Sequence, residues 1–181
     1  MSSAAAPGLT EDKHHRPSGA VNMGKVSTCL WFDGQAEEAA AFYTSIVKNS
    51  RVIDTVPSPE GGPGEPGSAM LVRFELDGQQ FAGLNGGPQF TFDEAVSVHI
   101  LCDSQEEIDE LWGKLTADGG EEGPCGWLKD KYGLSWQVDS RALFEMIISP
   151  DQKAAARATK AMFTMKKLDV QALQDAFDGK S

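Results

Sequence analysis

Several features are scarce in this 181-residue sequence, and each scarcity excludes a class of protein. No apolar run approaches the roughly 18 residues that a membrane-spanning helix requires. The N-terminus lacks a basic start followed by an apolar stretch, so we expect no export signal. Lys and Arg number 16 against 27 Asp and Glu, which gives a net charge of −11. Nucleic acids and anionic membranes bind clustered cations, so we expect neither partner.

Cysteine is also scarce. The three cysteines, Cys29, Cys102 and Cys125, lie in or near apolar segments and follow no metal-binding or disulfide spacing. Three thiols cannot all pair within one chain, and reduced thiols are typical of the cytoplasm. We therefore expect a cytoplasmic protein. A nucleophilic Cys125 is the weaker interpretation, because no His lies near it in the sequence.

The residues that are present predict a folded protein in three parts. Residues 1–24 are rich in Ala, Ser, Pro and Gly, so we expect a disordered tail. The adjacent His14 and His15 within this tail offer no preorganised metal site. Residues 25–140 alternate between strand and helix patterns, and residues 141–181 favour helices.

The middle part repeats one pattern twice. Residues 25–32 predict a strand, residues 34–48 an amphipathic helix, and residues 51–88 further strands around a loop rich in Pro and Gly. Residues 94–140 follow the same order, with a helix that runs through residue 117 and a loop at residues 121–122. We predict an α+β fold of tandem βαβββ modules, residues 25–88 and 94–140, which form curled mixed sheets. Three residues recur at an offset of 70: Asp33, Gln35 and Glu37 match Asp103, Gln105 and Glu107.

Beyond residue 140 the sequence predicts helices whose packing stays open. One helix begins at Pro150 and Asp151 and extends to about Met162, and Asp169 caps another. The second helix carries an apolar stripe that must be covered, either by this chain or by a second subunit. The stripe consists of Val170, Leu173, Ala176 and Phe177.

Two strands carry polar residues on one face. Because side chains alternate along a strand, Ser97 and His99 share a face, as do Ser135, Gln137 and Asp139. The opposite rows are wholly apolar and suit packing against helices. We interpret the mixed rows as the concave lining of a pocket. The alternative is that His99 is a hydrogen-bonded structural residue.

Three segments resemble a known family: LWFDGQAEEAAAFYTSIV, CGWLKDKYGLSWQV and AMFTMKKLDVQALQDAF. They are similar to the PhnB-like branch of the vicinal oxygen chelate superfamily, the glyoxalase and bleomycin-resistance fold, over residues 25–177. Many members of this branch are labelled 3-demethylubiquinone-9 3-methyltransferase. The resemblance implies paired βαβββ modules, each sheet curling around a pocket, usually in a homodimer.

The resemblance also implies where a metal would bind. Enzymes of the superfamily hold a divalent metal with His or Glu on strands of both modules. Carried onto this sequence, those positions fall at about Thr28, near Ala82, and at Ser97 and Gln137. Hydroxyls and amides bind first-row metals poorly, so we expect no tightly bound metal and no cofactor. His99 lies two residues beyond Ser97 on the same face, which leaves a weakly held divalent metal near His99 as an alternative.

The methyltransferase label has no support in the residues. Methyl transfer from S-adenosylmethionine usually needs a Gly-rich turn between a strand and a helix. The clustered glycines here alternate with prolines, which lack the backbone N–H donors of such a turn.

The sequence thus predicts a PhnB-like protein that binds a small, partly apolar molecule, without an assigned reaction. Two alternatives stay open: a metal- or His99-dependent enzyme with His99 as its catalytic residue, and a sequestering protein of the resistance type. Trp31 and Trp127 are candidate pocket walls because the other two tryptophans lie on predicted packing faces. The ligand-binding candidates are Thr28, Trp31, Ser97, His99, Trp127 and Gln137.

Overall fold

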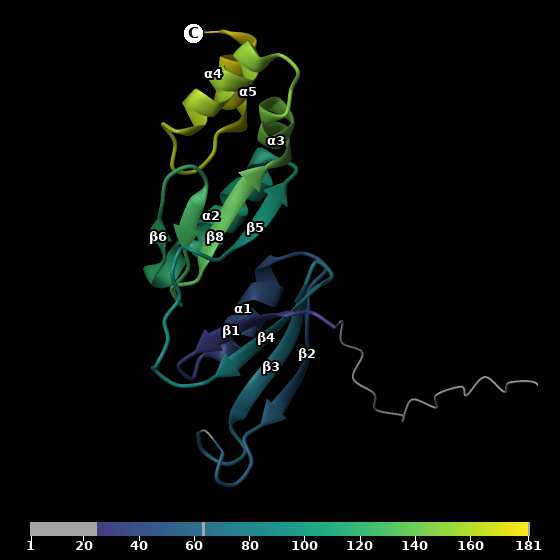
Figure 1. Ribbon diagram of the computed structural model, residues 1–181, viewed down its shortest axis with the longest axis vertical. Coiled ribbons are helices and arrows are strands. Elements are labelled where there is room, and N and C mark those ends of the chain that lie inside the picture. Colours follow the sequence, from purple (N-terminus) through teal and green to yellow (C-terminus); the bar gives the residue numbers. More distant parts are fainter. Residues whose placement is uncertain (1–24, 63, 181) are drawn as a thin grey trace, which may run out of the picture.

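A computed structural model describes residues 25–62 and 64–180 (Figure 1). The tail predicted for residues 1–24 lies outside the described residues. The first module contains β1 (Thr28–Phe32), α1 (Ala36–Ile46), β2 (Arg51–Pro57), β3 (Ala69–Leu76) and β4 (Gln79–Asn85). Its sheet has the order β1-β4-β3-β2, in which β1 runs parallel to β4 and the other pairs are antiparallel.

The second module repeats this topology. It contains β5 (Ser97–Cys102), α2 (Gln105–Leu115), β6 (Glu121–Glu122), β7 (Trp127–Lys129) and β8 (Ser135–Ser140). Its sheet has the order β5-β8-β7-β6, again with one parallel pair, β5 with β8. The predicted α+β fold of two βαβββ units is therefore confirmed.

Four elements differ from the prediction. The first strand and the first helix are shorter than residues 25–32 and 34–48. The second helix ends at Leu115 rather than Ala117, because Asp118 has a left-handed φ of 55° that interrupts the helix. Glu121 and Glu122 form the short strand β6 instead of the expected loop, since they pair with Lys129 and Leu128 while staying exposed.

The two modules share one core. Gly83 on β4 allows α1 to approach the first sheet, since a Cβ at this position would lie 3.2 Å from the Ala36 Cβ. Tyr43 on α1 then contacts the second module, with its ring 5.1 Å from that of Trp136 on β8. The buried residues of both sheets and of α1 and α2 form a single apolar cluster. The opposite face of each sheet therefore points away from this core.

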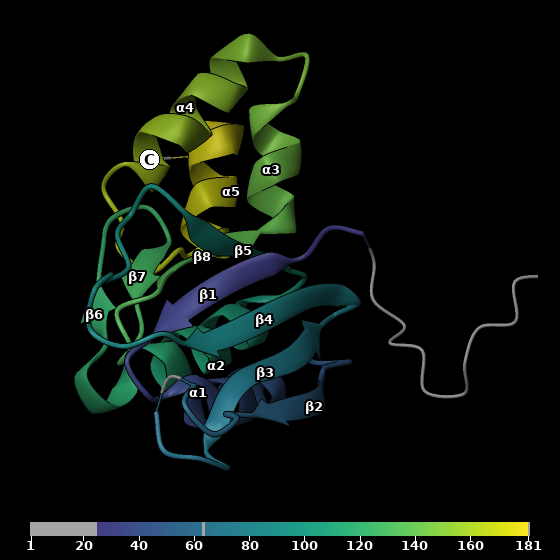
Figure 2. The same ribbon diagram turned by 60° about the horizontal axis from the view of Figure 1, so that its bottom comes forward.

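The remaining helices are α3 (Arg141–Ile147), α4 (Gln152–Met162) and α5 (Val170–Asp178), which stand together beyond the second module (Figures 1 and 2). Asp151 and Asp169 cap α4 and α5 as predicted. Within this chain, Leu173 of the α5 stripe is fully buried in one apolar cluster with Leu143 and Ala158. Among the described residues, every helix is too short or too polar to cross a bilayer.

Candidate functional site

The polar face of the second sheet brings two predicted residues into direct contact. Strands β5 and β8 are parallel and in register, so His99 lies beside Gln137, and Ser97 beside Ser135. The Gln137 amide Nε2 donates a hydrogen bond of 2.8 Å to Ser97 Oγ. Within the described residues, the Gln137 side chain has no other hydrogen bond, which leaves its amide oxygen as an acceptor on this face.

His99 has a carboxylate partner. Its Nε2 atom lies 3.4 Å from Asp139 Oδ2, and its side chain is 39% exposed. The Asp139 carboxylate is itself fixed, since the backbone N–H of Ser140 donates to its Oδ1 at 2.8 Å. The His99 Nδ1 atom has no hydrogen-bond partner among the described residues. The sequence placed Asp139 on this face, but only the register of β5 against β8 shows that it reaches His99.

Trp127 extends the same row. It pairs with Gln137 across β7 and β8, so His99, Gln137 and Trp127 follow one another across three strands. Trp127 is half-buried and offers an aromatic surface beside the polar pair. These residues, together with Ser97 and Asp139, form what we call the polar row.

His99 also borders a second feature. It lies on the edge strand β5, whose free side faces a groove of about 800 Å³ between the modules. Apolar side chains of both modules line this groove, among them Phe81 and Leu111, and charged side chains such as Lys48 and Glu107 line it as well. Ser97, Gln137 and Trp127 do not line it. His99 is therefore the residue that joins the polar row to this mixed groove.

The first sheet holds the other two candidates, and one of them faces the core. Thr28 shares its face of β1 with Leu30 and Phe32, which are buried beneath α1. Cys29 occupies the outward position instead, which agrees with the offset of 70 between Cys29 and His99. Trp31 points outward, but its Nε1 donates to the carbonyl of Gly87, and the loop after β4 packs over it.

The donor set does not fit a tightly held metal. The positions that correspond in the two modules are Cys29 beside Ala82 and His99 beside Gln137. Only one imidazole and one thiol are present among these four side chains. Across residues 25–62 and 64–180, no three His, Cys, Asp or Glu side chains are grouped so that they could hold a metal ion. His99 and Asp139 would supply two ligands, and a divalent site needs more.

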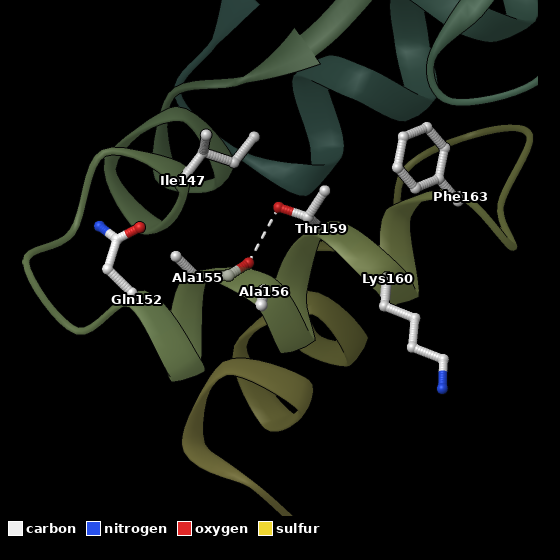
Figure 3. Close-up of a pocket in the computed structure, with 7 residues that line it drawn as sticks. All are labelled: Ile147, Gln152, Ala155, Ala156, Thr159, Lys160 and Phe163. Carbon is white, nitrogen blue, oxygen red and sulfur yellow. Dashed lines mark hydrogen bonds between the residues drawn. The ribbon is translucent and has the colours of Figure 1, made fainter.

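A hollow of about 420 Å³ on α4 offers little chemistry. Ile147 and Phe163 lie on either side of it, and Thr159 Oγ1 donates to the carbonyl of Ala155 at 2.9 Å (Figure 3). Lys160 is the one charged residue among those that line it. We therefore assign the candidate site to the second sheet rather than to these helices.

Comparisons with known proteins add a family to this geometry. The sequence profile of the 3-demethylubiquinone-9 3-methyltransferase family matches residues 24–139 and so ends before α3. A solved structure from Bacillus cereus, described as PhnB and a candidate 3-demethylubiquinone-9 3-methyltransferase, is 37% identical with a TM-score of 0.58. That alignment covers 65% of this chain and 99% of the other. Protein PA1353 from Pseudomonas aeruginosa is 19% identical with a TM-score of 0.52, over 65% of this chain and 98% of its own, and supports the fold alone. Among curated proteins no match is found.

Proposed function

Since the chain belongs to the 3-demethylubiquinone-9 3-methyltransferase family, the PhnB-like branch predicted from the sequence, we propose that it binds a small, partly apolar molecule on the second sheet. The observation that carries this proposal is the polar row. Gln137 is held by Ser97 while its amide oxygen stays available, and Trp127 lies beside it. His99 connects this row to the groove between the modules, where apolar side chains such as Phe81 lie among charged ones such as Lys48, so a ligand there meets both polar and apolar surfaces.

A second candidate function is favoured by the contact between His99 and Asp139. A histidine with a carboxylate at Nε2 and a free Nδ1 has the arrangement of a general base. An enzyme that uses it would abstract a proton from the bound molecule at Nδ1, and Asp139 would stabilise the imidazolium that results. Methyl transfer forms no part of the proposal, because the segment rich in Gly and Pro joins β2 to β3 rather than a strand to a helix.

A thermal-shift screen tests the binding proposal. The compounds are ubiquinone precursors, 2-oxo-aldehydes and glycopeptide antibiotics, and a compound that binds the folded state raises the melting temperature. Gln137→Ala should abolish the shift, and Gln171→Ala, an exposed glutamine on α5, should preserve it. Shifts that persist in Gln137→Ala would place the ligand elsewhere and refute the assignment.

Turnover separates the two candidates. Incubation of a stabilising compound with the protein, followed by mass spectrometry, shows whether the compound changes. Stabilisation without conversion supports binding alone, including sequestration of the resistance type. Conversion that is lost in both His99→Ala and Asp139→Asn supports the general base.

We also propose a cytoplasmic homodimer. The outer faces of both sheets point away from the core, and Ile148 and Phe163 are exposed at the ends of α3 and α4. A second copy could cover such surfaces. Free Cys29, Cys102 and Cys125 fit a reducing compartment. Light scattering should give twice the chain mass of 19.4 kDa, and a mass of one chain would refute the dimer.

A further inference from the structure

A second pocket lies beside the polar row. It has a volume of about 440 Å³, and residues of β6, β7 and β8 line it together with Glu94 from the loop before β5. Lys129 pairs with Ser135 on one side and with Glu121 on the other, so these three residues form the row next to that of Trp127. Trp127 therefore forms the wall that the pocket shares with the polar row.

Ser135 supplies the first sign of a ligand. The residue is 1% exposed, and its Oγ is a buried atom without a hydrogen-bond partner. Among the described residues it is the one buried side-chain atom in this condition. Buried hydroxyls are almost always hydrogen-bonded, because an unmade bond loses the hydration that the group had in water. Since Ser135 lines the pocket, a bound molecule with a donor or acceptor would satisfy it.

The charges around the pocket indicate the sign of that molecule. Lys129 Nζ lies 2.5 Å from Glu94 Oε1, so the one ammonium group at the pocket is already neutralised. Glu121 takes part in no ion pair with any described residue, although it faces the same pocket. The pocket therefore has a surplus of carboxylate, and the net charge of −11 attracts cations to the protein as a whole.

We propose that this pocket binds an organic cation, a protonated amine on a small apolar body. The ammonium group donates to the Glu121 carboxylate and to Ser135 Oγ, and the apolar body packs on the Trp127 ring. An aromatic face next to a carboxylate suits a cation, because the ring carries negative charge above its plane. The proposal stands on Ser135, Glu121 and Lys129, and it does not require a ligand at His99.

Nuclear magnetic resonance tests the charge preference with three matched probes: 2-phenylethylamine, 2-phenylethanol and phenylacetate. The reporter is the Trp127 indole N–H signal, assigned by its loss in Trp127→Phe. The amine should shift this signal until it saturates, and the affinities of the alcohol and the acid should be lower by about tenfold or more. An alcohol or acid that binds as tightly as the amine would overturn the proposal.

Variants place the amine in this pocket. Glu121→Gln and Ser135→Ala should each lower the affinity for the amine by about fivefold. This is the loss expected when one contact to a cation or one hydrogen bond is removed. Glu145→Gln, which removes the same charge from an exposed site on α3, should leave binding unchanged. Equal effects of Glu121→Gln and Glu145→Gln would mean that only the overall charge matters, and would refute the site. An unchanged spectrum outside the pocket verifies that each variant is folded.

Discussion

Asp130 joins the two modules, and Asp130→Asn is the most informative stability test of the fold. The residue is 2% exposed and lies in the turn between β7 and β8. Its Oδ2 accepts from Tyr43 Oη on α1 at 2.7 Å and from Trp136 Nε1 at 2.8 Å. Its Oδ1 accepts from the backbone N–H groups of Tyr132 at 2.8 Å and Leu134 at 3.1 Å. Four donors thus converge on one carboxylate.

The magnitude of the effect follows from this geometry. Asparagine replaces one accepting oxygen with an NH₂ group, which can only donate. If the NH₂ group takes the Oδ2 position, the Tyr43 hydroxyl can turn to accept, but the Trp136 N–H cannot. If it takes the Oδ1 position, two backbone donors lose their acceptor. At least one charge-assisted bond is lost and one buried donor stays unpaired, so the free energy of unfolding should fall by about 2–4 kcal/mol.

Urea unfolding followed by tryptophan fluorescence and by circular dichroism measures this loss. Tyr43→Phe removes one donor and leaves no unpaired donor behind, so it should lower the free energy of unfolding by about 1–2 kcal/mol. Asp118→Asn is the matched control, because the residue is exposed and Asn tolerates its left-handed φ of 55°. It should change stability by less than about 0.5 kcal/mol. A loss below about 1 kcal/mol in Asp130→Asn would refute the role of this carboxylate.

Three further predictions follow from other contacts. The hydrogen bond from the Asp103 backbone N–H, and then the contact with Lys48, hold the pKa of Glu107 below its usual range. This carboxylate therefore stabilises the folded state at pH values above its pKa in the unfolded chain. The contribution is lost as the pH falls through its pKa in the folded protein. Glu107→Gln should therefore flatten the acid limb of a plot of stability against pH, and an unaltered slope would contradict the assignment. Leu173→Ala opens a cavity among the C-terminal helices and should lower the free energy of unfolding in chemical denaturation by about 2–5 kcal/mol. A loss under about 1 kcal/mol would show that this core is loosely packed. Burial raises the pKa of the Cys102 thiol to about 12, so an aromatic disulfide reagent should label exposed Cys29 first, and equal rates would contradict the structure.

The alternation of apolar and polar residues along the strands, together with the repeat at an offset of 70, was sufficient to predict the topology of the modules. The same alternation placed His99 and Gln137 on one face, because a strand with one apolar row leaves little freedom of register. The side of β1 on which Thr28 lies follows from the same alternation, because Leu30 and Phe32 are buried and Cys29 takes the outward position that His99 has on β5.

Other features depend on contacts that no local pattern contains. Asp130 meets Tyr43 across 87 positions, and an acid in a turn otherwise predicts an exposed side chain. Ser135 lies on β8, and its burial depends on the neighbouring hairpin of β6 and β7. The sequence does not predict that hairpin, because β6 has only two residues and no apolar alternation. The helix cap supplied by Asn85 to the Ala36 N–H likewise joins residues that are 49 positions apart. Tertiary packing decides each of these.

The dissociation constant of a compound that stabilises the protein, measured by calorimetry for the wild type and for Gln137→Ala, tests the assignment of the binding site. Loss of the Gln137 amide removes an oriented hydrogen bond on the polar row, so affinity should fall about tenfold. Gln171→Ala should bind as the wild type does. Equal affinity in all three proteins would contradict binding at the polar row of the second sheet.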